Sequence, residues 1–160
     1  MNVDTGRSPV SALPDRREVI LPTGRVTYRQ AGSGPDIVFL HGLAGNSGTW
    51  IRQFEYFADR FQITAWDAPG YGGSDTVTPE IDVYGDVLGA FTASLGIHRF
   101  ILLGHSMGGV VAGNFSGRYP DRVAGLILSC THLGRNQRPG APLGAKYLAR
   151  LAQYEEMTPF

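Results

Sequence analysis

One serine of this chain stands in a setting that suits a nucleophile. Ser106 lies between Gly104 and Gly108, and the apolar run Phe100 to Leu103 comes directly before it. A Gly-x-Ser-x-Gly run between a strand and a helix makes a very sharp turn, from which the serine hydroxyl projects into open space. Both glycines are needed because side chains there would collide across the turn. We therefore expect Ser106 to attack an electrophilic carbonyl carbon.

The segment after this serine predicts a helix that begins at Met107 and is stopped by Pro120. The free N–H groups of its first turn would favour a developing oxyanion beside Ser106. Three glycines recur at four-residue spacing on one face of this helix, namely Gly109, Gly113 and Gly117. Without side chains on that face, the helix can approach the sheet closely. The alternative, a glycine-rich turn whose serine merely caps the helix, leaves this glycine series unexplained.

Two further loops follow predicted strands earlier in the chain. His41 to Gly45 comes after the apolar strand Asp36 to Leu40, and Asp67 to Ser74 comes after a strand at Phe61 to Trp66. Together with the turn at Ser106, these motifs resemble the α/β-hydrolase superfamily in kind and order, in particular its esterase, lactonase and carbon–carbon hydrolase group.

This resemblance covers roughly Glu18 to Cys130 and implies roles for individual residues. The backbone N–H groups of Leu43 and Met107 would form the oxyanion hole, where one lost donor typically costs about 3 kcal/mol. The residues that would support these loops are His41, Gly42, Asp67, Gly104, His105 and Gly108.

Asp67 and three aromatic residues could also have a direct role in chemistry or in substrate binding. We expect Asp67 to fix its loop through hydrogen bonds to backbone N–H groups, and to take no direct part in chemistry. Three aromatic residues, Trp50, Trp66 and Tyr71, could line an acyl pocket, although large aromatic side chains more often belong to the core.

A serine hydrolase needs a histidine base and an acid that orients it. His41 is expected to shape its loop, His105 to point away from its neighbour Ser106, and His98 to lie at the opposite end of the sheet. His132 follows the last predicted strand at the correct edge, but the family's chain order places the acid between the serine and the histidine. No acidic residue stands between Cys130 and His132. We therefore expect the acid and the base to be absent from these 160 residues, as in the N-terminal half of a longer hydrolase cut within its cap.

The remaining pattern predicts an α/β fold with a mostly parallel sheet of about six strands and flanking helices, lacking the C-terminal strands of the family. An opening hairpin at Glu18 to Arg29 precedes alternating strands and helices, and the last strand is expected at Val123 to Ser129. We expect a flexible lead-in over residues 1–16, the hydrolase core over 17–132, and a linker with the start of a cap over 133–160, which includes a helix at Lys146 to Met157.

Composition narrows the function classes. Fourteen basic and 14 acidic residues cancel, which argues against nucleic acid and against anionic membranes as partners. The single cysteine, Cys130, argues against disulfides and metal clusters, so we expect no cofactor and a cytoplasmic location. No apolar run reaches membrane-spanning length. The unpaired apolar edge at Val123 to Ser129 predicts poor stability or self-association.

Three functional interpretations remain. The first is a serine-nucleophile hydrolase of an ester, thioester, lactone or related small acyl substrate. The second is a non-catalytic remnant that binds an acyl ligand or a partner chain. The third is a cofactor-free haloperoxidase or a proline iminopeptidase on the same scaffold, since fold alone does not separate these chemistries. A serine at position 106 argues against dehalogenases and epoxide hydrolases, which need a carboxylate nucleophile.

Overall fold

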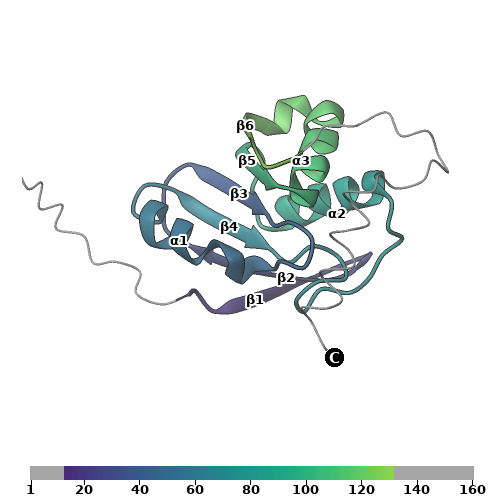
Figure 1. Cartoon of the computed structure of the whole chain (residues 1–160), viewed down its shortest axis with the longest axis horizontal. Helices are drawn as coiled ribbons and strands as arrows, with labels where there is room; N and C mark the ends of the chain where they lie inside the picture. Colours follow the sequence, from purple (N-terminus) through teal and green to yellow (C-terminus); the bar gives the residue numbers. More distant parts are fainter. Residues whose placement is uncertain (1–12, 132–160) are drawn as a thin grey trace, which may run out of the picture.

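The computed structural model describes residues 13–131 (Figure 1). The predicted helix at Lys146 to Met157, and most of the predicted lead-in and cap region, lie outside these residues. The strands are β1 (Arg16–Leu21), β2 (Gly24–Ala31), β3 (Asp36–Leu40), β4 (Gln62–Trp66), β5 (Phe100–His105) and β6 (Val123–Ser129). The α-helices are α1 (Ile51–Phe57), α2 (Ile81–Ser94) and α3 (Met107–Arg118), with short 3₁₀ turns at Ser47–Trp50 and Pro120–Arg122.

The described strands form one sheet in the order β1-β2-β4-β3-β5-β6. β1 and β2 form the predicted antiparallel hairpin, and β2 also pairs antiparallel with β4. The pairs β3–β4, β3–β5 and β5–β6 are parallel. The predicted six-stranded, mostly parallel α/β architecture is therefore confirmed. Because β3, β5 and β6 run in the same direction, the loops at their carboxyl ends meet at one edge of the sheet.

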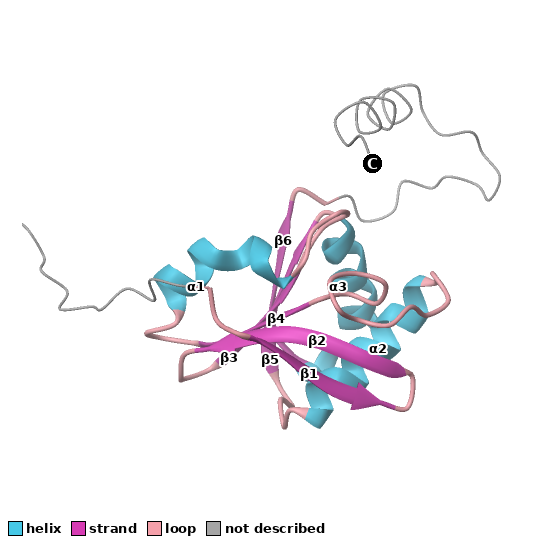
Figure 2. Cartoon of the chain, turned by 90° about the horizontal axis from the view of Figure 1, so that it is seen from below, coloured by secondary structure: helices cyan, strands magenta, loops and turns pink. Residues whose placement is uncertain are grey.

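Helices cover both faces of the sheet, and the alternation along β3 shows why both faces are apolar. Val38 and Leu40 belong to a cluster with residues of α2 and α3, whereas Ile37 and Phe39 belong to a cluster with residues of α1. In Figure 2, α1 lies on one side of the sheet and α2 and α3 lie on the other. A strand buried on both faces reads as a continuous apolar run, as the sequence of β3 does.

The first described residues already belong to the folded unit. Leu13 packs against the cluster under α1, and β1 begins at Arg16, so the folded part starts earlier than the predicted boundary at residue 17.

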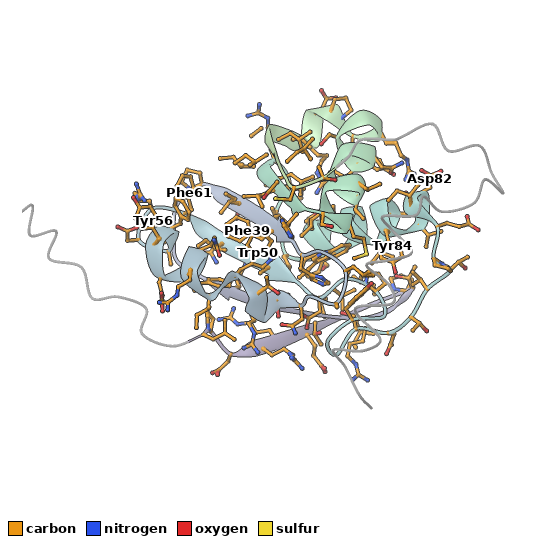
Figure 3. All side chains as sticks on the ribbon, viewed as in Figure 1. Phe39, Trp50, Tyr56, Phe61, Asp82 and Tyr84 are labelled. Carbon is orange, nitrogen blue, oxygen red and sulfur yellow. The ribbon has the colours of Figure 1, made fainter. Side chains whose placement is uncertain are left out.

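In the cluster under α1, Phe39 stacks on Trp50 with ring centroids 4.9 Å apart (Figure 3).

The glycines of α3 do not all serve the same purpose. A Cβ on Gly109 would come within 2.5 Å of the Thr131 side chain, whereas a Cβ on Gly117 would meet no atom within 4 Å. The expected close approach thus holds at Gly109, and the interpretation of Gly117 as part of a close-packed series is wrong.

The last strand lies at the edge of the described sheet. β6 pairs with β5 and with no other described strand. Leu126 is 40% exposed and Ile127 is 46% exposed, and they point to opposite faces of the strand. Each face of β6 therefore exposes an apolar side chain, although Val123 and Leu128 pack against the core. None of the described helices is long and apolar enough to cross a membrane.

Candidate active site

Ser106 occupies the strained turn that its sequence predicts. It has φ 53° and ψ −116°, and it links the end of β5 at His105 to the start of α3 at Met107. A non-glycine residue with positive φ is uncommon and costs free energy, so the surrounding structure must hold it in place. Its backbone N–H donates to the carbonyl of Ser129 at 2.9 Å, which ties the turn to the end of β6.

Strained residues gather around this serine. Three described non-glycine residues have positive φ: Ala44 at 58°, Ser106 at 53° and Cys130 at 50°. They follow β3, β5 and β6 respectively, and these three strands are parallel neighbours in the sheet. Backbone strain of this kind clusters at functional sites, so this edge is the strongest candidate for the active site.

Glycines allow three backbone segments to converge here. A Cβ on Gly104 would clash with the carbonyl of Gly108, and a Cβ on Gly108 would clash with the carbonyl of Leu40 at the end of β3. A Cβ on Gly42 would lie 3.1 Å from the Cβ of Ser106. The loop after β3 is therefore packed directly against the candidate nucleophile.

Two backbone N–H groups beside Ser106 are available to a ligand. Neither the N–H of Leu43 nor that of Met107 has a hydrogen-bond acceptor among residues 13–131. Met107 is the first residue of α3, where an N–H has no partner within the helix. Leu43 is 61% exposed, so the residue lies at the surface. These are the two donors that the sequence predicts for an oxyanion hole.

His41 links the two loops beside the serine and is fully engaged in doing so. Its Nε2 accepts a hydrogen bond from the N–H of Ala68 at 3.0 Å, which requires the proton to be on Nδ1, and Nδ1 donates to the carbonyl of Gly42 at 2.8 Å. The imidazole is fully buried, and this burial lowers its pKa, against the opposing effects of the Gly42 carbonyl and the Asp67 charge. This neutral ring holds the loop, as predicted, and has no free nitrogen for proton transfer.

Asp67 holds one backbone N–H, which belongs to the loop after β3, and one side-chain hydroxyl. Its Oδ1 accepts from the N–H of Ser47 at 2.6 Å, and its Oδ2 accepts from the hydroxyl of Thr27 at 2.5 Å. The carboxylate is fully buried, and the Nε of Arg16 lies 3.6 Å from Oδ2. Sequence reasoning missed Thr27 and Ser47, because a short-range motif marks neither of them.

The structure brings no described imidazole against the Ser106 hydroxyl. Nδ1 of His105 lies 3.4 Å from Oγ of Ser129, and His98 precedes β5 at the opposite end of the sheet. His132 lies outside the described residues. Among the described residues, no group of three or more metal-ligating side chains is found.

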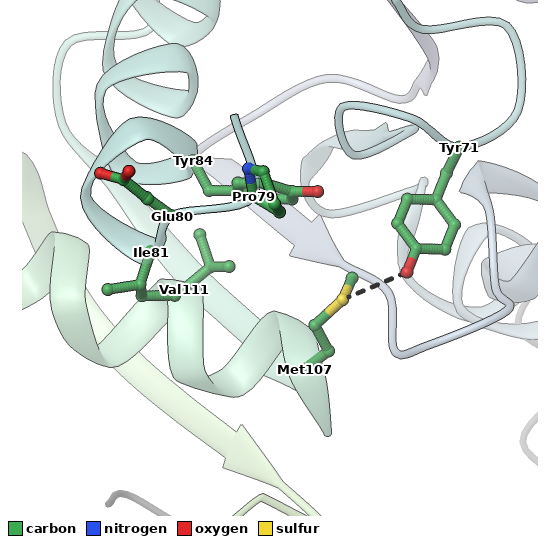
Figure 4. Close-up of a pocket in the computed structure, with 7 residues that line it drawn as sticks. All are labelled: Tyr71, Pro79, Glu80, Ile81, Tyr84, Met107 and Val111. Atoms are coloured by element: carbon green, nitrogen blue, oxygen red, sulfur yellow. Dashed lines mark hydrogen bonds between the residues drawn. The ribbon is translucent and has the colours of Figure 1, made fainter. Parts of the chain in front are cut away.

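An apolar pocket opens next to the turn (Figure 4). Its volume is about 290 Å³, and it lies between the start of α2, the start of α3 and the loop after β4. The lining residues are Tyr71, Pro79, Glu80, Ile81, Tyr84, Met107 and Val111. The two tyrosine hydroxyls already donate, that of Tyr71 to Sδ of Met107 at 3.5 Å and that of Tyr84 to the carbonyl of Pro69 at 3.0 Å. The walls therefore present mainly carbon to a ligand.

Of the three aromatic residues considered for such a pocket, only Tyr71 lines this one. Trp66 is 1% exposed and Trp50 is 7% exposed, and both belong to the core clusters. Their size favours burial in the core, as the alternative interpretation held.

Comparison with known proteins agrees with this geometry. The family model described as alpha/beta hydrolase fold matches residues 35–159, which is most of the chain. The chain belongs to the α/β-hydrolase fold family. This membership agrees with the six-stranded, mostly parallel sheet and its flanking helices.

The relatives of this α/β hydrolase have diverse chemistry. It is 39% identical over 106 residues to an uncharacterised protein of Mycobacterium tuberculosis, covering 65% of this chain and 31% of that protein. It is 34% identical over 110 residues to 2-hydroxy-6-oxo-6-phenylhexa-2,4-dienoate hydrolase of Comamonas testosteroni, covering 64% and 38%. The structure of an N-acyl homoserine lactonase bound to N-butanoyl homoserine aligns with a TM-score of 0.68 and 26% identity, covering 73% and 45%. The chain spans about a third of the length of these curated relatives.

Proposed function

We propose that Ser106 is the nucleophile of a hydrolase that cleaves an ester, thioester, lactone or related acyl compound with a small apolar acyl group. The observation that carries this proposal is the strained Ser106 beside the N–H groups of Leu43 and Met107, which have no acceptor among residues 13–131. Donors that are fixed before the reaction stabilise charge in the transition state without reorganisation, and this term is often the largest in such reactions.

The proposed reaction proceeds through an acyl-enzyme. Oγ of Ser106 attacks the carbonyl carbon, its proton passes to a base, and the negative oxygen that forms is held by the N–H groups of Leu43 and Met107. Collapse of this intermediate expels the alcohol or thiol, which takes the proton, and leaves the acyl group on Ser106. Water then gives a proton to the base and attacks the acyl group, and the acid is released as Oγ of Ser106 takes that proton back.

The base and its orienting acid are proposed to come from residues other than 13–131. His41 is buried with both ring nitrogens engaged, and His98 lies at the wrong end of the sheet. His105 has its Nδ1 directed at Ser129. In a chain without those partners Ser106 would be a weak nucleophile, because an unactivated hydroxyl is poorly reactive at its free pKa.

The apolar pocket supports the choice of an apolar acyl group. Met107 contributes its N–H to the proposed oxyanion hole and its side chain to the pocket wall, so a bound carbonyl and the pocket would be adjacent. A volume of about 290 Å³ is at the lower end of ligand pockets and suits part of a small substrate. The relatives that act on a lactone and on a carbon–carbon bond are compatible with this class.

The test is labelling with a fluorophosphonate probe, which reacts with activated serines. We expect rapid labelling in the longest protein encoded in frame with this chain, abolished by Ser106→Ala, and slow labelling in the 160-residue chain itself. A longer protein that folds and resists the probe would overturn the proposal in favour of a non-catalytic binder of acyl ligands. Rapid labelling of the 160-residue chain that persists in His132→Ala would overturn the claim that its base comes from outside residues 13–131.

A further inference from the structure

Thr131, the second residue after β6, contacts the backbone of the candidate nucleophile. Its hydroxyl donates a hydrogen bond to the carbonyl oxygen of Ser106 at 2.8 Å. That carbonyl also accepts from two amides of α3, those of Gly109 at 3.0 Å and Val110 at 3.4 Å. Among the described residues, Thr131 provides the only hydrogen bond to this carbonyl from outside its own helix.

The backbone turn before Thr131 and the space beside Gly109 allow this contact. Cys130 adopts φ 50°, which turns the backbone sharply at the end of β6. A Cβ on Gly109 would lie 2.5 to 2.6 Å from three atoms of the Thr131 side chain, so the absence of a side chain at Gly109 makes the room that Thr131 occupies. The steric fit and the hydrogen bond are independent observations, and both place Thr131 against the turn.

The carbonyl that Thr131 binds and the proposed oxyanion donor at Met107 are parts of one peptide group. The Ser106 carbonyl and the Met107 N–H belong to the same planar peptide unit, and in a trans peptide they point in opposite directions. Holding the carbonyl toward Thr131 therefore directs the Met107 N–H to the other side, toward the space beside the serine hydroxyl. An amide whose carbonyl accepts a hydrogen bond is also polarised into a stronger donor.

From these contacts we infer that Thr131 is a positioning residue for catalysis, which orients the Met107 N–H of the oxyanion hole through the Ser106 carbonyl; this rests on the proposed function of Ser106. Thr131 contacts the carbonyl of Ser106 and would act on the reaction through it. Its effect is expected on transition-state stabilisation, and thus on kcat, while KM stays the same.

The first experiment measures the amide directly and needs no activity. The chain contains three methionines, so labelling with ¹⁵N-methionine gives a simple amide spectrum, in which Met107→Leu identifies the Met107 signal. Thr131→Val removes the hydroxyl at nearly constant shape, and we expect the Met107 amide proton to move upfield. Thr131→Ser keeps the hydroxyl and should retain the signal near its original position. An unmoved Met107 signal in folded Thr131→Val would overturn the inference.

The second experiment measures catalysis in the longest protein encoded in frame with this chain. For a short-chain ester, Thr131→Val should lower kcat about three- to tenfold, the value of one net hydrogen bond, with KM unchanged and with rescue by Thr131→Ser. Equal kcat in wild type and Thr131→Val would overturn the inference and leave the proposed function intact. A wild-type protein that resists the fluorophosphonate probe would overturn the proposed function and with it the catalytic role of Thr131, while the amide measurement still decides whether Thr131 polarises the Met107 N–H.

Two further variants guard against misfolding. If Thr131→Val loses its circular dichroism signal, Thr131→Cys replaces the hydroxyl with a weak thiol donor and takes its place in both experiments. Gly109→Ala would push the Thr131 side chain away without changing Thr131 itself. It should shift the Met107 amide in the same direction, and a shift in the opposite direction would count against the inference.

Discussion

The carboxylate of Asp67 holds the backbone N–H of Ser47 at 2.6 Å, across 20 residues of sequence. Asp67 follows β4, and Ser47 begins the 3₁₀ turn that ends the loop after β3. Together with the hydrogen bond from Ala68 to His41, this contact makes the two loops one unit on the side of the sheet edge where Ser106 lies.

Removal of this carboxylate should destabilise the fold. We expect Asp67→Ala to lower the free energy of unfolding by about 3 kcal/mol, because it leaves two buried donors, on Ser47 and Thr27, without their charged acceptor. Urea denaturation followed by circular dichroism measures the change. Asp121→Ala, at an exposed position, is the matched control and should change stability by less than about 0.5 kcal/mol. Equal stability of the two variants would contradict the role given to Asp67.

The burial of His41 predicts a specific pH dependence of stability. Burial lowers the pKa of His41 in the folded state below its unfolded value of about 6.5. The unfolded chain therefore gains a proton first as pH falls through that value, and stability contributed by the neutral ring is lost toward acid. His41→Gln keeps an acceptor for the Ala68 N–H but cannot titrate. Its stability should fall less steeply between pH 7 and pH 5, and an identical slope in both proteins would refute this account.

Two glycines of α3 provide a matched pair for the packing argument. Gly108→Ala places a methyl group against the carbonyl of Leu40, so we expect a loss of at least about 2 kcal/mol of stability and weaker labelling of Ser106. Gly117→Ala meets open space near the end of the helix and should stabilise by about 0.5 kcal/mol through helix propensity. Thermal unfolding of both variants measures the difference, and destabilisation by Gly117→Ala would show packing that the structure lacks.

The apolar pocket can be tested with a second matched pair. Ile81 is 38% exposed and begins α2, where it lines the pocket, whereas Ile51 is 37% exposed and begins α1 on the other face of the sheet. In the longest protein encoded in frame with this chain, Ile81→Asp should raise KM for a hexanoyl ester about tenfold and leave KM for an acetyl ester nearly unchanged. The reason is that about three buried CH₂ groups of the hexanoyl chain would each lose part of their burial free energy of roughly 0.8 kcal/mol. Ile51→Asp should change neither value. A uniform effect of Ile81→Asp on both esters would show that the pocket does not bind the acyl group.

The exposed faces of β6 predict self-association of the 160-residue chain. Leu126 and Ile127 expose apolar surface on opposite faces of an edge strand, which favours contact with other copies. We expect the apparent mass in size-exclusion chromatography with light scattering to rise with concentration, and Leu126→Lys with Ile127→Glu to reduce that rise. A concentration-independent monomer would contradict this prediction.

The sequence alone determined the element order and the identity of the candidate nucleophile. The apolar runs of β3 and β5, the glycines around Ser106 and the alternation of strands and helices are local signals with a direct backbone cause. The donors Leu43 and Met107 were predicted from the resemblance to the α/β-hydrolase superfamily, and their role in an oxyanion hole stays a prediction. Sequence reasoning overestimated the glycine series of α3, since helical spacing places Gly117 on a face of the helix but does not say whether anything packs there.

Only the tertiary structure decided which distant residues complete the site. Thr27, Ser47 and Thr131 are ordinary residues in the sequence, and each acquires its role from a partner that lies 20 to 40 residues away along the chain. Whether Tyr71 or the two tryptophans would line a pocket was likewise settled by packing. Hydrogen bonds and steric fit between separate segments depend on distances of a few tenths of an ångström, and those distances are set by the folded arrangement of the sheet and its helices.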